Sequence, residues 1–165
     1  MPMPGSRRLR LTFSVSLIMT GPALAQHDPN TPAALPVVPY RVENDSIEAP
    51  LTGRPGDPVR GAGLFANRQV STCLLCHADP GPARSNIPQA SGSTIGPLLT
   101  GVASRLTEGQ IRLRIVDAAR LNPNTVMPSF YVVAGLNRVG RQWQGKPILD
   151  AEQIDDLVAY LATSR

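Results

Sequence analysis

Residues 72–81 read TCLLCHADPG, and this stretch contains both cysteines of the 165-residue chain. Cys73 and Cys76 are three positions apart, and His77 follows directly. Three kinds of site use such a group: a zinc site, a redox-active dithiol, and the Cys-x-x-Cys-His sequence to which c-type haem is attached. The three differ in what else they need from the chain.

A zinc site needs four ligands, and the second histidine that would have to help, His27, lies far away in a proline-rich segment. A redox-active dithiol normally follows a strand and opens a helix in a βαβ unit, and no such pattern is present. On one turn of helix, Cys73 and Cys76 share a face, so both sulfurs can reach the vinyl groups of one porphyrin. His77 would then be the proximal iron ligand. The sequence therefore predicts one covalently bound haem c.

Residues 1–25 have the layout of a cleaved secretory signal. A basic start, MPMPGSRRLR, precedes an apolar run and a small-residue triplet that ends at Ala25. The apolar run of about 15 residues is shorter than the roughly 20 that a spanning helix needs. We therefore expect cleavage after about Ala25, no membrane anchor in the mature chain, and a location in the periplasm. Haem attachment would also remove both thiols from oxidising chemistry there.

The charge of the chain depends on this leader. Three of the sixteen basic residues lie in it and all twelve acidic residues lie beyond it, so cleavage lowers the net charge from +4 to +1. No basic patch remains, and nucleic-acid binding is not predicted.

A haem iron in an electron carrier usually has a sixth ligand, and Met127 is the only methionine outside the leader. It lies in NPNTVMPSFY, where Pro123 and Pro128 prevent a helix. Ligation by histidine and methionine raises the reduction potential and leaves no position open for substrate. Met127 is therefore the predicted distal ligand. His27 is the alternative, although ordering a tail onto the iron costs entropy, and a role for Met127 in the core remains open.

The remaining pattern is helical. After a proline-rich extension at 26–56, the domain at 57–165 opens with a helix capped by Asp57. A second helix is predicted from the capping box at Thr107 to Asn122, and a third from Asp150 with an apolar stripe on one face. Arg112 and Arg114 in the second helix either neutralise haem propionates or form a solvated face. The fold class is all-α: a small domain with long loops around the haem.

These motifs together resemble class I cytochromes c. The resemblance implies that the Pro97 carbonyl accepts a hydrogen bond from Nδ1–H of His77. It also implies that Gly61 and Phe65 pack against the last helix, opposite Tyr160. One departure is the spacing of eight residues between Phe65 and Cys73, which is longer than usual in that family and affects how the first helix docks.

More specifically, residues 36–163 resemble the SoxX family, the monohaem subunit of SoxAX cytochromes in periplasmic thiosulfate oxidation. The segments that carry this resemblance are GDPVRGAGLFANRQVSTCLLCH, STIGPLLTGVASRL, LRIVDAARLNPNTVMPSFY, LNRVGRQWQGKPILDAEQIDDLVAYL and APLTGRPGDP. The resemblance implies a SoxA-like partner in a heterodimer, a SoxYZ-like carrier whose cysteine is joined to thiosulfate, and a soluble cytochrome c as electron acceptor. This chain would then be part of an enzyme, of the L-cysteine S-thiosulfotransferase type, only as a subunit, with no catalytic residue of its own.

Three alternatives stay open. A free-standing class I cytochrome c shuttle would have the same haem but no obligate partner, and the extension at 26–56 argues against it. A haem peroxidase would need an open distal side, and a cofactor-free domain would leave the cysteines unexplained. We expect the apolar residues Val37, Val38, Tyr40 and Val42 of the extension to be buried against the partner. The loop at 78–93 is expected to be solvated, or to line the haem edge that faces the partner.

Overall fold

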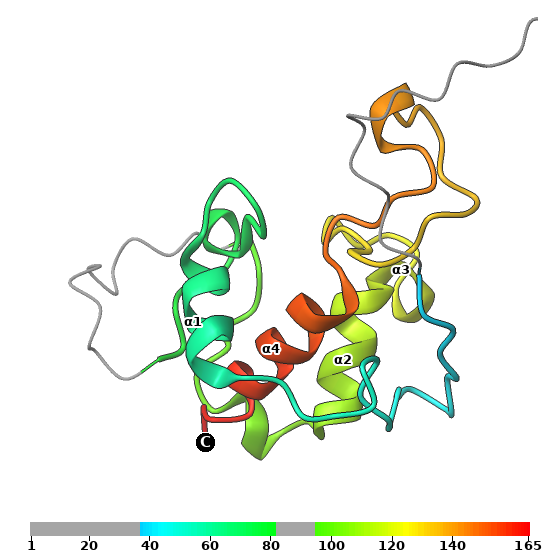
Figure 1. Ribbon diagram of the computed structural model, residues 1–165. Coiled ribbons are helices and arrows are strands. Elements are labelled where there is room, and N and C mark those ends of the chain that lie inside the picture. Colours follow the sequence, from blue (N-terminus) through cyan, green and yellow to red (C-terminus); the bar gives the residue numbers. More distant parts are fainter. Residues whose placement is uncertain (1–36, 82–94) are drawn as a thin grey trace, which may run out of the picture. The chain divides into compact units, whose positions relative to one another are not determined.

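The computed structural model describes residues 37–81 and 95–165. The leader, His27 and most of the loop at 78–93 lie outside these residues. Within them the chain forms four α-helices and three short 3₁₀ turns, and its only β-bridge is an isolated one between Glu43 and Ser46 (Figure 1). The elements are α1 (Pro58–Ala66), η1 (Cys73–Leu75), η3 (Val102–Ser104), α2 (Glu108–Val116), α3 (Ala118–Leu121), η4 (Arg141–Trp143) and α4 (Ala151–Leu161). The predicted all-α fold class is confirmed.

Helix α1 begins where the sequence predicted. The Asp57 carboxylate accepts hydrogen bonds from the backbone N–H groups of Val59, at 2.7 Å, and Arg60, at 3.1 Å. Pro58 occupies the first helical position, where its missing N–H has no cost. These backbone hydrogen bonds lower the pKa of Asp57, because they stabilise its ionised form.

Helices α1 and α4 cross in close contact (Figure 1). A Cβ atom at Gly61 would lie 2.0 Å from the carbonyl oxygen of Asp156, so only glycine allows the two backbones to approach this closely. The rings of Phe65 and Tyr160 meet with their centroids 5.6 Å apart. The packing predicted for these residues is confirmed. The long spacing to Cys73 does not disturb it.

The extra residues between α1 and Cys73 form a compact turn. The Asn67 side chain accepts from the N–H groups of Gln69 and Val70, and the Ser71 hydroxyl donates to Leu64 O at 2.5 Å. Ser71 is fully buried. The turn therefore satisfies its own polar groups and leaves the docking of α1 unchanged.

Helix α4 is held by its cap and by its apolar face. Asp150 and Gln153 form the predicted capping box. The predicted apolar stripe is buried in the core: Ile154, Leu157, Val158 and Leu161. Around it pack residues of α2 and the aromatic rings of Phe130 and Tyr131.

The second predicted helix is wrong in one respect, because the chain breaks it at Asp117 into α2 and α3. Asp117 has ψ 75°, far from the helical value. Its carboxylate accepts from the N–H of Arg120, at 3.3 Å, and from the hydroxyl of Ser129, at 2.9 Å. An aspartate that caps a new turn competes with continuation of the helix, and this one also ties α3 to the segment that carries Met127.

The segment at 37–56 packs against the helices. Three of the four apolar side chains that we expected to be left for a partner contact the core instead: Val37, Tyr40 and Val42. The Val38 N–H donates to the Tyr131 hydroxyl at 2.8 Å, and Val38 is the one of the four with an exposed side chain. Their own domain therefore buries these three side chains in part, and further burial against a partner stays a prediction.

Arg112 also differs from expectation. It is only 2% exposed, so it does not belong to a solvated face, and its partners are in the protein. The guanidinium donates to Asp155 Oδ1 at 3.1 Å and to the carbonyl oxygen of Ile47 at 2.6 Å. Asp155 in turn accepts from the N–H groups of Leu51 and Thr52. This buried ion pair joins the segment at 37–56 to α2 and α4.

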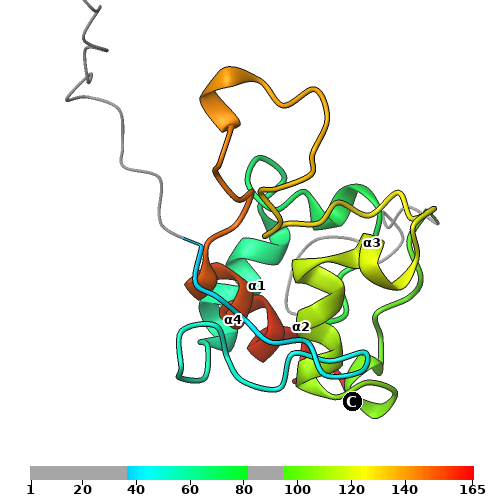
Figure 2. The same ribbon diagram turned by 90° about the vertical axis from the view of Figure 1, so that its right-hand side faces the viewer.

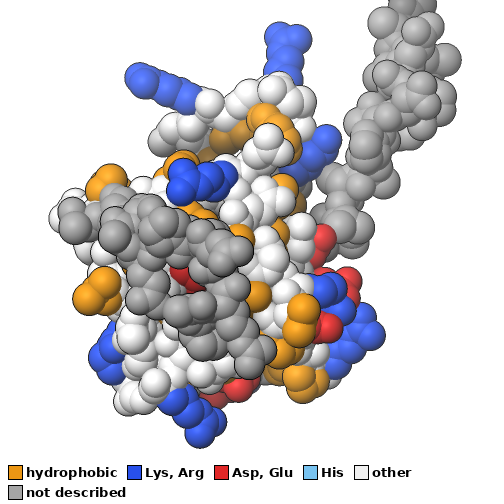
Figure 3. Space-filling model, turned by 90° about the vertical axis from the view of Figure 1, so that its left-hand side faces the viewer, with side chains coloured by type: hydrophobic (Ala, Val, Ile, Leu, Met, Phe, Trp, Pro, Cys, Tyr) orange, Lys and Arg blue, Asp and Glu red, His pale blue; other side chains and the backbone are white. Residues whose placement is uncertain are grey.

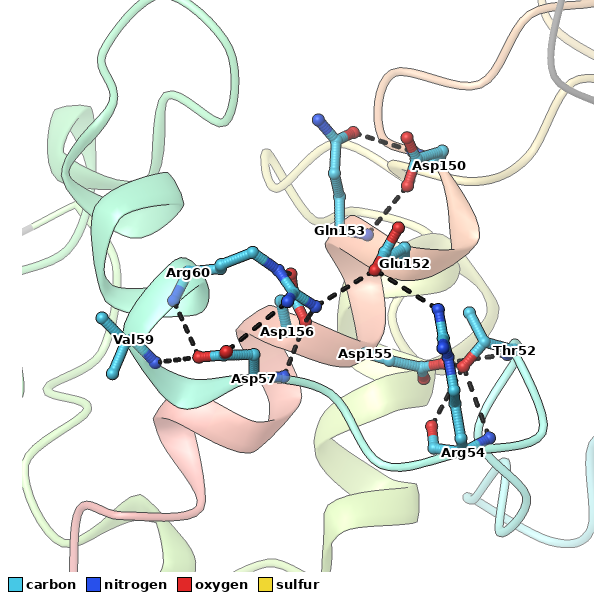
Figure 4. A network of polar contacts seen from close by, with 10 residues as sticks. All are labelled: Thr52, Arg54, Asp57, Val59, Arg60, Asp150, Glu152, Gln153, Asp155 and Asp156. Carbon is cyan, nitrogen blue, oxygen red and sulfur yellow. Dashed lines mark hydrogen bonds and ion pairs between the residues drawn. The ribbon is translucent and has the colours of Figure 1, made fainter.

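A second polar network lies at the surface where α1 meets α4 (Figure 4). Arg60 binds Asp156 through two nitrogens, at 2.7 and 2.8 Å, and Asp156 also accepts from the N–H of Asp57. Glu152 lies between Arg60 and Arg54. The exposed pairs of Glu152 contribute little to stability. The bidentate contact of Arg60 with the buried Asp156 is stronger and fixes the angle between the two helices.

The residues between Tyr131 and Leu149 form a loop that extends away from the helices (Figure 2). Its base is closed by hydrogen bonds from the N–H groups of Ile148 and Leu149 to Phe130 O. No acidic residue occurs between positions 118 and 149. Lys and Arg side chains stand out from the surface at the top of the view in Figure 3.

Candidate functional site

Cys73 begins the 3₁₀ turn η1 and Cys76 caps its C-terminal end. The N–H groups of Cys76 and His77 both donate to Cys73 O, at 3.1 and 2.9 Å. Thr72 starts the turn with a left-handed backbone (φ 58°). The structure thus brings the two thiols and the imidazole together on one short turn, as the attachment of a single planar group requires.

The imidazole of His77 is held by a second segment of chain. Its Nδ1 lies 2.9 Å from the carbonyl oxygen of Pro97, and the N–H of Gly96 donates to Cys76 O at 2.8 Å. A Cβ atom at Gly96 would lie only 2.4 Å from His77 Cε1, so the loop can approach the ring only because residue 96 is glycine. Since a carbonyl can only accept, the proton is assigned to Nδ1 and Nε2 keeps its lone pair. That is the form that binds a metal.

Cys73 does not have the character of the nucleophile of a redox-active pair. Burial is the largest influence on the Cys73 thiol and raises its pKa; the thiol also lies 3.7 Å from Ser71 O. A reactive dithiol needs a cysteine with a lowered pKa, since the thiolate is the nucleophile. Among the described residues no strand precedes the turn. Both observations count against the dithiol alternative.

Met127 lies in the irregular segment after α3. It is partly buried against the core, and its N–H donates to Thr125 Oγ1 at 3.1 Å. The segment returns to the helices through the N–H of Phe130, which donates to Ile115 O at 3.1 Å. Pro128 follows Met127 directly, so no helix incorporates the methionine. Ligation of iron by Met127 stays a prediction, as does a contribution from His27, which lies outside the described residues.

The side chains next to these ligand candidates fit a large apolar group. Leu98, beside Pro97, is 72% exposed, and Val126, beside Met127, is 78% exposed. Exposed side chains of this size are ones that a bound porphyrin would shield from water. Together with two thiols on one turn and an imidazole with a free Nε2, the site fits a covalently attached haem.

Three contacts around His77 were not predicted from the sequence. They involve Arg105, Ser164 and the pair Asp79–Tyr160. Tyr160 was expected to lie opposite Gly61 and Phe65, but not to contact Asp79, and no local pattern marks Ser164 as a contact of a loop 63 residues away. These residues could be found only from the fold.

Other sites are not indicated in the part of the chain that the structure describes. No cluster of three or more His, Cys, Asp or Glu residues there is arranged to hold a metal ion. Nor is any helix in residues 37–81 and 95–165 long and apolar enough to cross a bilayer.

Comparisons with known proteins give one informative result. No family model and no curated protein matches the chain. Among solved structures, the crystal structure of SoxXA from P. pantotrophus matches with a TM-score of 0.65 and 33% sequence identity. The match covers 79% of this chain and 97% of that chain. The similarity therefore extends over nearly the whole of the solved chain and goes beyond a shared haem-binding turn.

Proposed function

Because the chain belongs to the SoxX family and has its small, all-α, cytochrome c-like fold, we propose that it is a c-type cytochrome that transfers electrons within a SoxAX complex. The observation that carries the proposal is the 33% identity over 97% of a SoxXA chain. The Cys73–Cys76 turn and the contact between His77 and Pro97 support it.

The haem would be bound by residues of this chain alone. Cys73 and Cys76 would hold it through thioether bonds, and His77 and Met127 would ligate its iron. When bound, the group supplies a one-electron couple between ferric and ferrous iron. The Pro97 carbonyl orients the imidazole and makes it a better donor.

This arrangement suits electron transfer better than sulfur chemistry. Joining thiosulfate to a thiol requires an accessible sulfur or an open metal position. After attachment the chain has no other cysteine, and ligation by Met127 closes the sixth position. The oxidative step therefore belongs to a SoxA-like partner, and this chain receives the electrons.

The remaining parts of the proposal follow from the family. The protein is exported to the periplasm and loses residues 1–25. The mature chain then consists of the extension at 26–56 and the domain at 57–165. It forms a heterodimer with the SoxA-like subunit, acts on a SoxYZ-like carrier through that complex, and passes electrons to a soluble cytochrome c. The alternative is a diffusible cytochrome c shuttle that needs no partner.

The surface that we assign to the partner is the loop between Tyr131 and Leu149. Leu136 and Trp143 are exposed there, and the charged side chains are Arg138, Arg141 and Lys146. Exposed tryptophan and arginine residues are typical anchors of interfaces. Positive charge without any acidic residue selects an acidic face on the partner.

Co-expression with a SoxA-like subunit tests both the function and this surface. The chain alone is expected to leave cytochrome c oxidised in the presence of thiosulfate and a carrier thiol, whereas the pair reduces it. Full activity of the lone chain would contradict the assignment of the oxidative step to the partner.

Variants of the loop address the interface separately. Arg138→Glu with Arg141→Glu should weaken co-purification and leave the haem spectrum unchanged. Arg41→Glu is the matched control, because Arg41 is exposed on another segment and makes only a surface ion pair. Equal effects of the two changes would contradict the assigned surface.

A further inference from the structure

Ser164, just after α4, contacts both of the chain segments that flank the ring of His77. We propose that Ser164 is a positioning residue for this ligand: it sets how closely the Pro97 carbonyl approaches Nδ1 of His77, and thereby the potential of the haem. The inference rests on the proposed function, since it concerns the ligand of the proposed haem.

The hydroxyl of Ser164 lies at the centre of the contact. It accepts a hydrogen bond from the N–H of Gly101 at 3.0 Å. It can donate its one proton either to Leu99 O, at 3.3 Å, or to Pro80 O, at 3.4 Å. The main chain adds a further bond, from the N–H of Ala103 to Ser164 O at 2.9 Å. The side chain and the main chain of Ser164 therefore both bind the loop at 99–103.

The positions of these partners give the contact its effect on His77. Pro80 lies three residues after His77, and Leu99 lies two residues after Pro97. When it donates to Pro80 O while accepting from the N–H of Gly101, the hydroxyl bridges the two segments whose separation determines the distance between Nδ1 and the carbonyl oxygen. Ser164 is buried, so water does not readily replace a lost hydroxyl, and the loop would relax instead.

Two neighbouring contacts act on the same segments. Arg105 donates to Leu98 O at 2.9 Å and to Thr100 O at 2.8 Å, on either side of Leu99. The Tyr160 hydroxyl donates to the Asp79 carboxylate, next to Pro80. Arg105 is exposed, and its hydrogen bonds compete with water, so we expect it to contribute less than Ser164.

The electronic consequence has a definite sign. A short hydrogen bond from Nδ1–H to a carbonyl gives the imidazole more negative character and makes it a better donor to iron. A better donor favours the ferric state and lowers the reduction potential. A loop freed by the loss of the Ser164 hydroxyl lengthens the bond, so the potential rises.

The test compares three variants of the haem-loaded protein. Ser164→Ala should raise the midpoint potential and speed hydrogen exchange of the His77 Nδ1 proton, followed by NMR. Ser164→Thr keeps a hydroxyl and should restore both toward the wild type. Ser46→Ala is the control, because Ser46 is also a buried serine, and its hydroxyl bonds Glu48 in another part of the domain. It should leave both readouts unchanged.

The outcomes separate this inference from the proposed function. Absence of covalent haem from the wild type would refute the proposed function. A haem-loaded Ser164→Ala with the wild-type potential and exchange rate would overturn only the inference, as would equal shifts in Ser46→Ala. If Ser164→Ala yields no holoprotein, Arg105→Gln loosens the same loop and should raise the potential by less; no shift there would also overturn the inference.

Discussion

The two proposed iron ligands are held in very different ways. His77 lies on a hydrogen-bonded turn, its Nδ1 is 2.9 Å from Pro97 O, and the loop opposite is fixed to Cys76 O through the N–H of Gly96. Among the residues that the structure describes, Met127 makes only the hydrogen bond from its own N–H to Thr125, and its neighbour Val126 is 78% exposed. The difference teaches that hydrogen bonds within the protein position the imidazole of His77, whereas the segment of Met127 is constrained mainly by its neighbouring prolines.

The largest effect should come from removing Cys73 or Cys76, the proposed attachment points of the haem next to His77. In Cys73→Ala or Cys76→Ala we expect most of the stable holoprotein to be lost, because each substitution removes one of the two proposed thioether bonds to the haem. Haem staining after denaturing gel electrophoresis measures how much protein carries covalently bound haem. Leu75→Ala is the matched control: Leu75 lies on the same turn and its side chain is half exposed, so the stained band should remain. Complete extraction of haem from the wild type by acid–acetone would disprove thioether attachment.

A smaller but still large effect is expected from Gly96→Ala. The new methyl group would lie 2.4 Å from Cε1 and 2.6 Å from Nδ1 of His77, so the loop must move. Overpacking of this kind costs about 1–3 kcal/mol, and the shifted carbonyl should also change the potential. Denaturant unfolding of the holoprotein measures the loss.

Gly63→Ala provides the control for that change. A Cβ atom at Gly63 meets nothing within 4 Å, and alanine in a helix is roughly 0.5–1 kcal/mol better than glycine. We therefore expect a gain in stability there. If Gly96→Ala were as stable as Gly63→Ala, the loop that carries Gly96 and Pro97 would not be tightly packed against His77.

Met127→Ala should alter the spectrum more than the fold. We expect loss of the weak absorption band near the red edge that reports sulfur–iron ligation, binding of exogenous ligands at the sixth position, and a lower potential. Because Met127 is only partly buried, the free energy of unfolding should fall by less than about 2 kcal/mol. Met127→Leu keeps the apolar volume and should lose the band with almost no change in stability. Survival of the band in either variant would show that Met127 is not its source, whereas absence of the band from the wild type would make His27 the next residue to test.

The smallest effect concerns Tyr160→Phe, which removes the hydrogen bond to Asp79. The loss should be about 1 kcal/mol at neutral pH. Burial, reinforced by Asp79, raises the pKa of Tyr160 above its ordinary value. The stabilisation is therefore fully present below the unfolded pKa of about 10 and is lost as the pH rises through the higher folded value. The difference in unfolding free energy between the wild type and Tyr160→Phe should therefore be smaller at pH 11 than at pH 7. A constant difference would show that the hydroxyl does not titrate with unfolding.

The parts of the molecule that could be predicted from the sequence depend on residues close together in the chain. The caps at Asp57, Thr107 and Asp150 act on N–H groups two or three positions away, so the helix starts were predicted correctly. The Cys-x-x-Cys-His turn is equally local. The break at Asp117 was missed because its carboxylate binds Ser129, twelve residues on. The apolar periodicity of the sequence could not show that α2 ends at Val116.

Only the tertiary structure decided which polar residues are buried and what they contact. Arg112 pairs with Asp155, which is 43 residues away, and Ser164 reaches Pro80 across 84 residues. Periodicity identifies an apolar face, but a charged or hydroxyl side chain is buried only where docked elements supply partners for all its polar atoms. The sequence by itself therefore determined the helices and the residues able to bind a haem. The crossing of α1 with α4, and the segments that dock beside them, decided how His77 is held.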